Sequence, residues 1–266
     1  MTGVQTCALP ILKLAIQTIL WGPNPPSIKE VLREAREVGY QGVEVFQHPG
    51  LLGTAEEFYS LLQEVDGLAL VGLSGGSIVQ RVEFIRDFLV VQAVEAPISR
   101  AIPFQHPPLS SVRPYAYVDE AQDVAWFAEN PIEGVTLALH PHMFKSVQTA
   151  NEARDLLSKH KWLKFLPDPA HLKIAGEKPA EVVEEFWNRL AGIHMKDWTA
   201  EFGRAYQFYA QGFTDLGQGD AELPSLMSFL RSKRYPGWLI VERDTSSELK
   251  ATAERAFRWL QSRLVG

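Results

Sequence analysis

Two histidines, His140 and His142, follow a short apolar stretch at 135–139 (VTLAL) near the middle of the chain. The stretch has the composition of a buried strand, and side chains two residues apart in a strand point to the same side. Pro141 lies between the histidines and offers no N–H to a neighbouring strand, so the strand should end here. Two imidazoles at the end of a buried strand can bind a metal ion or transfer protons, and we interpret this position as a candidate site.

Other ionisable side chains follow or lie in further strand-like stretches. Each has a simple structural explanation when taken alone, since Asp168 before a proline can form a turn and Lys196 can form an ion pair with Asp197 or Glu44. Burying several such groups without partners costs several kcal/mol each, so their coincidence favours a shared cation. The residues in question are Glu44, Asp168, His171, His194, Lys196, Asp197, Glu242 and Asp244.

The strands that must position these residues alternate with helix-like stretches. Ser27 with Glu30 and Thr54 with Glu57 form capping-box patterns that predict two helix starts, and Gly39 should end the first helix. The predicted strands are 12–21, 42–46, 68–74, a strand within 96–104, 135–139, 162–168, 190–198 and 237–244. The predicted helices lie at 28–38, 54–65, 78–92, 117–129, 149–159, 178–189, 221–233 and 247–263.

This alternation predicts the fold class. Eight strands that each precede a helix, with apolar rather than alternating sequence, are typical of a single (β/α)8 TIM barrel, here residues 12–266. An open doubly wound sheet is the alternative, but no glycine-rich dinucleotide-binding loop follows the first strand. In such barrels the chemistry lies at the carboxyl ends of the strands, where the polar residues above are expected.

Composition excludes several classes of function. The chain has 266 residues, 46% of them hydrophobic and 22% charged, with a net charge of −6, which argues against a surface that binds nucleic acid. No apolar run is long enough to span a membrane. A single cysteine, Cys7, allows no internal disulfide and suggests a reducing cytoplasm. Residues 1–11 lack the strand and helix periodicity of the later residues and are predicted to be a non-native or disordered leader.

The sequence resembles the sugar isomerase/epimerase superfamily with the xylose-isomerase-like barrel over residues 12–263. The motifs that carry the resemblance are GVEVF (42–46), PDPAHL (167–172), HMKD (194–197), GQGD (217–220) and YPGWLIVERD (235–244). The last two recur together in this superfamily and are fairly specific. Members hold a divalent metal ion with one ligand from each of strands five to eight. The resemblance implies the metal ligands His140, Asp168, His194 and Glu242.

One departure bears on the reaction. Many isomerases and epimerases of this superfamily have a glutamate where His140 stands, paired with the glutamate that corresponds to Glu242. The HPHM run (140–143), together with Trp21 and Gly22, instead resembles inosose dehydratase-like members and the related 3-keto-glycoside lyases. Phe144 and Lys145 replace the Gly and Thr expected there, so the substrate is left open.

The ligand set implies a reaction type. Two imidazoles and two carboxylates suit Mn²⁺, our first choice, or Co²⁺, Zn²⁺ or Fe²⁺ better than Mg²⁺. A cation that polarises a ketone acidifies the adjacent C–H, because it stabilises the resulting enolate. We predict a lyase that removes this proton from a keto-polyol or keto-sugar and expels a β-oxygen. His142 is the expected base, and His171 the second candidate and acid.

Other residues have auxiliary roles in this hypothesis. Lys196 would polarise the carbonyl or the leaving oxygen, and Glu44 would hold a substrate hydroxyl or support a ligand. Trp21 and Phe46 would form apolar walls for a sugar ring. The segment 106–117 is interpreted as a surface loop, with a lid or a contact to another subunit, identical or different, as alternatives.

Two rival functions stay open and one is disfavoured. A sugar isomerase or epimerase would use the same metal site, and a degenerate site would leave a non-catalytic sugar-binding or partner subunit. A phosphodiester-cleaving endonuclease on the same barrel would need more metal ligands and a basic surface, which the net charge of −6 does not provide.

Overall fold

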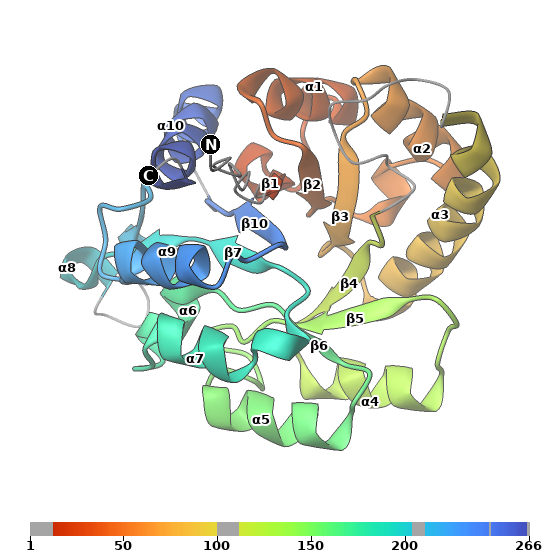
Figure 1. The fold of residues 1–266 in the computed structure, drawn as a ribbon. Helices are drawn as coiled ribbons and strands as arrows, with labels where there is room; N and C mark the ends of the chain where they lie inside the picture. Colours follow the sequence, from red (N-terminus) through yellow and green to blue (C-terminus); the bar gives the residue numbers. More distant parts are fainter. Residues whose placement is uncertain (1–12, 100–111, 204–210, 245, 265–266) are drawn as a thin grey trace, which may run out of the picture.

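The computed structural model describes residues 13–99, 112–203, 211–244 and 246–264, and an eight-stranded parallel sheet lies at its centre (Figure 1). A parallel bridge between Phe165 and Leu190 joins the two edges, so the sheet closes on itself. The predicted (β/α)8 TIM barrel is confirmed. In sheet order the strands are β6 (Lys164–Phe165), β5 (Thr136–Leu139), β4 (Tyr115–Val118), β3 (Ala69–Leu73), β2 (Gly42–Val45), β1 (Lys13–Gln17), β10 (Trp238–Val241) and β7 (Ile193–Met195).

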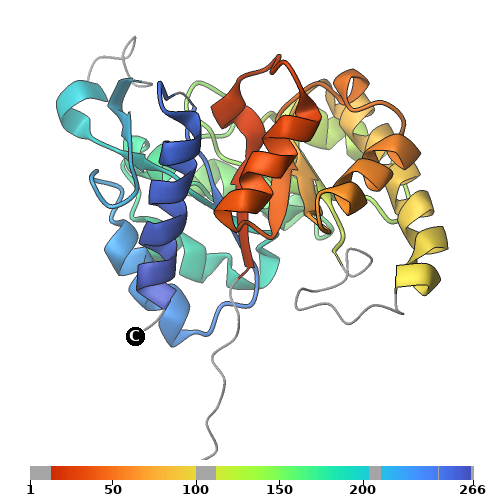
Figure 2. The same ribbon diagram turned by 90° about the horizontal axis from the view of Figure 1, so that it is seen from above.

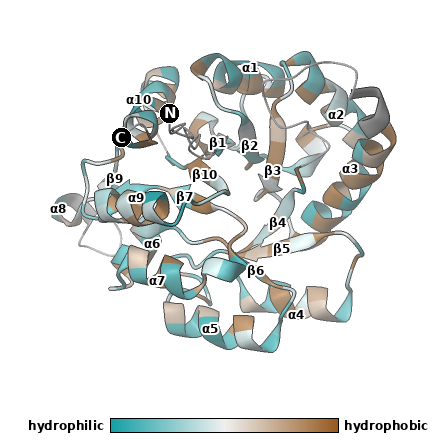
Figure 3. Ribbon diagram, in the orientation of Figure 1, coloured by the Kyte–Doolittle hydropathy of each residue, from teal (hydrophilic) through white to brown (hydrophobic). Residues whose placement is uncertain are grey.

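Helices surround the strands, as the two views in Figures 1 and 2 show. Hydrophobic residues gather along the strands and on the helix faces turned toward them (Figure 3). The α-helices are α1 (Ile28–Val38), α2 (Ala55–Glu64), α3 (Ile78–Ser99), α4 (Ala121–Glu129), α5 (Ala150–Lys159), α6 (Pro169–Ile174), α7 (Pro179–Glu185), α8 (Ala200–Gly203), α9 (Leu223–Ser232) and α10 (Leu249–Leu264). Short 3₁₀ helices are η1 (Thr18–Trp21), η2 (Pro49–Leu51) and η4 (Trp187–Arg189), and β8 (Asp197–Trp198) pairs antiparallel with β9 (Phe213–Thr214).

The predicted helix boundaries at α1 and α2 are confirmed. Ser27 accepts the N–H of Glu30, and Thr54 and Glu57 form both hydrogen bonds of a capping box. Gly39 ends α1 with a φ of 115°, and a Cβ there would meet the Phe257 ring at 2.7 Å. Only glycine combines that backbone conformation with the close approach of α10.

The prediction of the fourth strand is wrong. Residues 96–99 continue α3, whereas 100–104 lie outside the described residues. The strand is Tyr115–Val118, where aromatic and β-branched side chains are all buried, and α4 begins only at Ala121. Good helix formers after residue 92, such as Ala93, Glu95 and Ala96, extend α3 to Ser99, and Pro97 falls in its last turn.

Other predicted elements differ in extent. The stretch 12–21 divides into β1 and η1, and 190–198 divides into β7 and β8. A helix absent from the prediction, α6, begins directly after Asp168, with Pro169 at its first position. The predicted leader 1–11 and most of the 106–113 loop lie outside the described residues. Among the described helices, none combines the length and the apolar character that a membrane span requires.

Candidate metal centre

The carboxyl end of β5 carries His140 and His142. The N–H of His140 donates to the carbonyl of Val118 at 2.8 Å, so pairing with β4 continues to this residue, and Pro141 then ends it. The two rings lie on one side of the chain with centroids 5.8 Å apart. His140 is completely buried, whereas His142 is half-buried. The placement expected from the sequence for these two side chains is thus observed.

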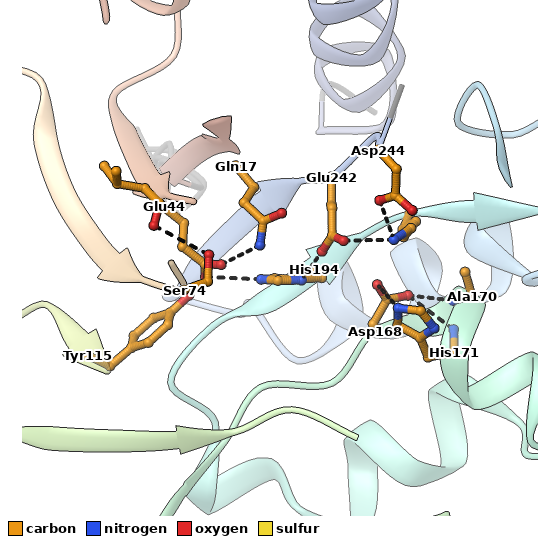
Figure 4. Close-up of polar contacts among 12 residues, drawn as sticks. Gln17, Glu44, Ser74, Tyr115, Asp168, Ala170, His171, His194, Glu242 and Asp244 are labelled. Carbon is orange, nitrogen blue, oxygen red and sulfur yellow. Dashed lines mark hydrogen bonds and ion pairs between the residues drawn. The ribbon is translucent and has the colours of Figure 1, made fainter. Parts of the chain in front are cut away.

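Asp168 joins β6 to α6, and the cap of the helix fixes its carboxylate. Oδ1 accepts the N–H groups of Ala170 and His171 at 2.7 and 3.3 Å (Figure 4). Oδ2 is buried and has no hydrogen-bond partner among the described residues. The turn-forming role and a ligand role are therefore compatible, because each uses a different oxygen.

His194 on β7 lies between two carboxylates, those of Glu44 and Glu242 (Figure 4). Its Nε2 is 3.0 Å from Glu44 Oε2, and because the carboxylate can only accept, Nε2 carries the hydrogen. Its Nδ1 is 2.5 Å from Glu242 Oε2, outside hydrogen-bond geometry. The parallel pairing of β7 with β10 sets Ile240 opposite His194, and Glu242, two residues further, donates its N–H to the carbonyl of Met195 at 3.1 Å.

The four predicted ligands converge. His140, Asp168, His194 and Glu242 each offer one ligand atom, and these atoms all lie within 4.8 Å of one another. All four side chains are buried, and the described residues supply no hydrogen-bond partner for the His140 ring nitrogens, Asp168 Oδ2, His194 Nδ1 or Glu242 Oε2. Unpaired buried polar atoms are costly, and a cation of suitable size removes that cost. The residues present therefore fit a divalent metal ion.

Burial disfavours charge on two of the four side chains, whereas neighbouring carboxylates favour positive charge at a third. Burial raises the pKa of Asp168 to about 7, and burial lowers that of His140 well below its usual range. For His194, burial acts to lower the pKa, but Glu44 and Glu242 outweigh it and raise the pKa to about 10. The field at the point between the carboxylates thus stabilises a cation.

Lys196, between β7 and β8, forms ion pairs different from those considered in the sequence analysis. Its Nζ lies 2.7 Å from Glu242 Oε1 and 2.7 Å from Asp244 Oδ1, and 4.0 Å from the centroid of the Phe213 ring. The predicted pairing with Asp197 or Glu44 is wrong. Burial acts to lower the pKa of Lys196, but the two carboxylates outweigh it and raise the pKa, so the ammonium is permanently charged.

Asp197 has a structural role that the sequence did not reveal. Its two oxygens accept the N–H groups of four residues, three of them in or next to the GQGD segment. Gly219 is required there, because a Cβ would lie 2.4 Å from Asp197 Oδ1. Asp197 therefore holds this segment in place beside the antiparallel strand pair β8–β9. The bound N–H groups are those of Trp198, Gly217, Gly219 and Ala221.

Glu44, on β2, contacts the predicted ligand His194. Gln17 donates to its Oε1 at 2.5 Å, and the Tyr115 hydroxyl donates to its Oε2 (Figure 4). Of the two roles considered for Glu44, the geometry favours the support of a ligand, since its Oε2 also fixes His194. Sequence reasoning misses Tyr115 because it places the fourth strand elsewhere. The aromatic YAYV pattern (115–118) is the signal that could have found it.

The remaining predicted residues lie around this centre. His171 on α6 is buried, and its ring is 3.9 Å from that of His142, measured between centroids. Trp21 in η1 is half-buried, and its indole N–H donates to Glu34 at 2.6 Å. Phe46 is half-buried directly after β2. Trp21 and Phe46 thus follow neighbouring strands, and their role as walls for a substrate stays a prediction.

Comparison with known proteins gives three kinds of match. Residues 105–263 match the family described as xylose isomerase-like TIM barrel. Curated relatives include inosose dehydratases of Clostridium botulinum, 27% identical over 140 residues, and of Clostridium perfringens, 30% identical over 137 residues. These alignments cover 48% and 47% of this chain and 47% and 46% of those proteins, so the chain spans about half the length of the curated relatives it matches.

Solved structures share the fold. A probable 3-DHS dehydratase from Bacillus anthracis has a TM-score of 0.66 at 15% identity, with 94% of this chain and 99% of that one covered. The 3-keto-D-glucoside 4-epimerase from E. coli has a TM-score of 0.62 at 19% identity, with the same coverage of 94% and 99%. At such identities the likeness concerns the fold alone.

Proposed function

Because this chain belongs to the xylose isomerase-like TIM barrel family, we propose that it is a divalent-metal-dependent lyase acting on a keto-polyol or keto-sugar. One observation carries the proposal: a buried cluster of four ligand atoms within 4.8 Å of one another stands beside a pair of imidazoles, His142 and His171, whose rings are 3.9 Å apart. The inosose dehydratase relatives agree with a reaction that removes water from a cyclic ketone.

The metal would be held by His140, Asp168 Oδ2, His194 Nδ1 and Glu242 Oε2. When bound, a divalent cation supplies Lewis acidity toward a substrate carbonyl. The mixed nitrogen and oxygen ligands favour Mn²⁺, with Co²⁺, Zn²⁺ and Fe²⁺ next and Mg²⁺ last. With the metal bound in place of a proton on Nδ1, the carboxylate of Glu44 would keep the hydrogen of His194 on Nε2.

His142 is the proposed base, and its surroundings define which nitrogen acts. Nδ1 lies 2.6 Å from the carbonyl oxygen of Met143 and therefore carries the hydrogen, which leaves a lone pair on Nε2. Burial, with Lys196 adding to it, lowers the pKa of His142, so the ring is neutral at pH 7. A neutral imidazole can accept the proton from the carbon next to the carbonyl.

His171 would act on the leaving oxygen. Both of its ring nitrogens are buried without a partner among the described residues, so its N–H is available to donate a hydrogen bond. Burial lowers the pKa of His171 well below its usual range, which disfavours a permanently protonated acid. In this scheme His142 takes the proton from carbon and returns it to the leaving oxygen, which His171 orients.

Lys196 would act through Glu242 rather than on the substrate. Its ammonium is held between Glu242 and Asp244, which keeps the Glu242 carboxylate ionised and oriented. Burial acts to raise the pKa of Glu242, but Lys196 and His194 outweigh it and hold the pKa well below its usual range. This role differs from the direct polarisation of a carbonyl that the sequence suggested.

The placement of the imidazoles favours elimination over epimerisation. An epimerase must remove a proton from one face of a carbon and return one to the other, so it needs two groups on opposite faces. His142 and His171 lie side by side, and the glutamate that would pair with Glu242 is replaced by His140. Two adjacent imidazoles can act on a proton and a leaving group that lie on the same face of the substrate.

The test is a substrate screen with metal-loaded protein. Keto-inositols, 3-keto-glycosides and ketohexoses would be incubated with protein reconstituted with each divalent cation, and products would be followed by proton NMR. We expect loss of a hydroxyl or an alcohol from the substrate, abolished by a chelator and restored by one cation. Exchange of a proton without any leaving group would establish the epimerase alternative, and protein that purifies without metal and turns over nothing would establish a binding subunit.

A further inference from the structure

Exposed hydrophobic side chains gather on the outer face of α3, away from the barrel mouth. Four of the seven large hydrophobic residues that are exposed in the described part of the chain lie on α3 or in η2, which contacts α3. Val90 and Val94 are 62% and 66% exposed, and Val79 and Leu51 are exposed near the start of the helix. Figure 1 shows α3 at the edge of the molecule, beside α2. Single exposed apolar side chains are ordinary, but a group of them on one helix indicates an interaction surface.

The barrel accounts for the inner face of α3 but not for this outer one. Val82, Ile85 and Phe88 are buried in the hydrophobic core, and the Phe88 ring lies 6.4 Å from that of Phe58 on α2, measured between centroids. A helix that packs on one face alone normally presents polar residues on the other. Because α3 carries apolar residues on both faces, we expect a second surface to cover the outer one.

The spacing of the exposed residues indicates what that surface is. Val79, Glu83, Arg86 and Val90 follow one another at intervals of four, three and four residues, so they form one stripe along the helix. This spacing reads the same in both directions. If a second copy of α3 packs antiparallel about a twofold axis between residues 84 and 85, Val79 meets Val90 of the second copy, and Glu83 meets Arg86 of the second copy. Every pair in the stripe is then apolar with apolar or acidic with basic.

We propose that the outer face of α3 is the interface of a homodimer, in which the α3 helices of two copies pack antiparallel about a twofold axis. A twofold interface uses the same patch on both copies, so the patch must be complementary to itself, and the stripe meets that condition. A different protein would not require the symmetric spacing or the matched charges.

Two further features fit this arrangement. Arg86 Nε lies 2.8 Å from Asp87 Oδ1 in the same chain, and the guanidinium keeps further N–H groups for Glu83 of the second copy. Val94 lies beyond the stripe and would face the segment just before α3 of the second copy. That segment packs against η2, since a Cβ at Gly76 would lie 2.8 Å from Pro49, so Val94 reaches the exposed Leu51 of the second copy.

The proposed interface is small. One pair of helices lies at the low end of the area of specific complexes, roughly 1,200 Å² in total. We therefore expect a dimer with a dissociation constant of about 10–100 μM, which sedimentation velocity can follow over about 1–200 μM.

Charge reversal tests the pairing. Glu83→Arg and Arg86→Glu each place like charges opposite one another twice, because the twofold axis repeats the pair, and each should raise the dissociation constant by about tenfold or more. The double variant restores opposite charges and should return to within about twofold of the unaltered protein. Arg258→Glu is the matched control, because this exposed arginine of α10 also pairs with an acidic residue of its own helix, and it should change nothing. A chain that stays monomeric up to about 200 μM, a dimer that neither reversal weakens, or a double variant that stays weakened would overturn the proposal.

Disulfide trapping tests the register. Val79→Cys and Val90→Cys would be combined in a chain that also carries Cys7→Ser, and the protein would be oxidised and examined by non-reducing electrophoresis. Within one chain the two positions are about 16 Å apart along the helix, too far for an internal disulfide. We expect a covalent dimer from the double-cysteine chain and none from either single cysteine. A covalent dimer from Val90→Cys alone, or no covalent dimer from the pair, would overturn the antiparallel register.

Discussion

The two halves of the barrel mouth differ in whether their buried polar groups have hydrogen-bond partners. On the ligand half, formed by β5, β6, β7 and β10, atoms of His140, Asp168, His194 and Glu242 lie close together without hydrogen-bond partners among the described residues. On the network half, formed by β1, β2 and β4, both oxygens of Glu44 accept hydrogen bonds. The Thr18 hydroxyl likewise donates to Gln47 Oε1 at 2.6 Å. Among the described residues at these strand ends, Gln17 Oε1 is buried without a hydrogen-bond partner.

This difference distinguishes side chains that would bind a ligand from side chains that hold their neighbours in place. An unpaired buried polar atom costs about 1–3 kcal/mol, so several of them at one point persist only where a ligand satisfies them. A satisfied network instead fixes side chains before any ligand arrives. His194 connects the halves, because one ring nitrogen belongs to the network and the other to the ligand cluster. Substitutions on the two halves should therefore differ in kind as well as in size.

The largest effect is expected at Asp168. Asp168→Asn keeps an oxygen to cap α6 but removes the charge of the unpartnered Oδ2. We expect loss of bound divalent metal and a fall in kcat of at least ~10³-fold. Metal analysis after dialysis and a thermal melt would be measured together. A variant that melts normally and keeps one metal ion per chain would contradict the assignment of the ligand half.

His142→Ala should have the next largest effect, on turnover alone. The side chain is adjacent to the proposed ligands without being one of them, so the metal content should stay at the level of the unaltered protein while kcat falls by about 10²–10⁴-fold. His48→Ala, at an exposed histidine in the loop after β2, is the matched control and should have no effect on either quantity. Unchanged turnover in His142→Ala would remove this residue from the mechanism.

A smaller effect is expected on the network half, at Glu44. Glu44→Gln can keep a hydrogen bond with His194, but it weakens the preference for the tautomer that presents Nδ1 to the metal. We expect metal affinity to fall by about 10–100-fold, with turnover recovering at saturating metal. Titration with Mn²⁺ followed by activity would show this. A fall in kcat that excess metal does not restore would place Glu44 at the substrate instead.

Sequence patterns predict the ligand half better than the network half. The ligand-half residues stand at or near strand ends, and a barrel fixes where strand ends meet, so the sequence places a larger set of polar residues at one mouth. The family resemblance then selects His140, Asp168, His194 and Glu242 from that set. The network half depends on which side chain of β4 faces Glu44, and misplacing that strand hides Tyr115.

Two errors have a different origin. The partners of Lys196 could not be predicted, because Asp244 lies beyond the end of β10, where the loop conformation decides the direction of a side chain. Asp197 was likewise misjudged, since its role depends on two strands of two residues each, too short to leave a periodic pattern. Contacts made by loops and by very short strands are the part of this site that sequence periodicity does not encode.

The smallest effect is expected for substitutions of the glutamates that cap the helices after β5 and β2, Glu152 and Glu57. Glu152 caps α5 and accepts the N–H groups of Gln148 and Thr149, which end the loop that begins at His142. These hydrogen bonds lower the pKa of Glu152, so its contribution to stability is present above the unfolded value near 4.5 and is lost as the pH falls through the lower folded value. Glu152→Gln should cost about 0.5–1 kcal/mol at pH 7, after allowance for solvent screening, and the difference in Tm should shrink toward pH 3.

Glu57→Gln weakens the equivalent capping box of α2, which follows β2 on the network half, because it removes the charge of the accepting group. It should cost a similar amount of stability, because the cap has the same geometry. The two variants should differ in activity, since Glu152, unlike Glu57, anchors the loop that carries His142. We expect a loss of kcat/KM of about two- to fivefold in Glu152→Gln and none in Glu57→Gln. Equal losses in both would mean that the β5–α5 loop is positioned by the barrel as a whole rather than by its own helix cap.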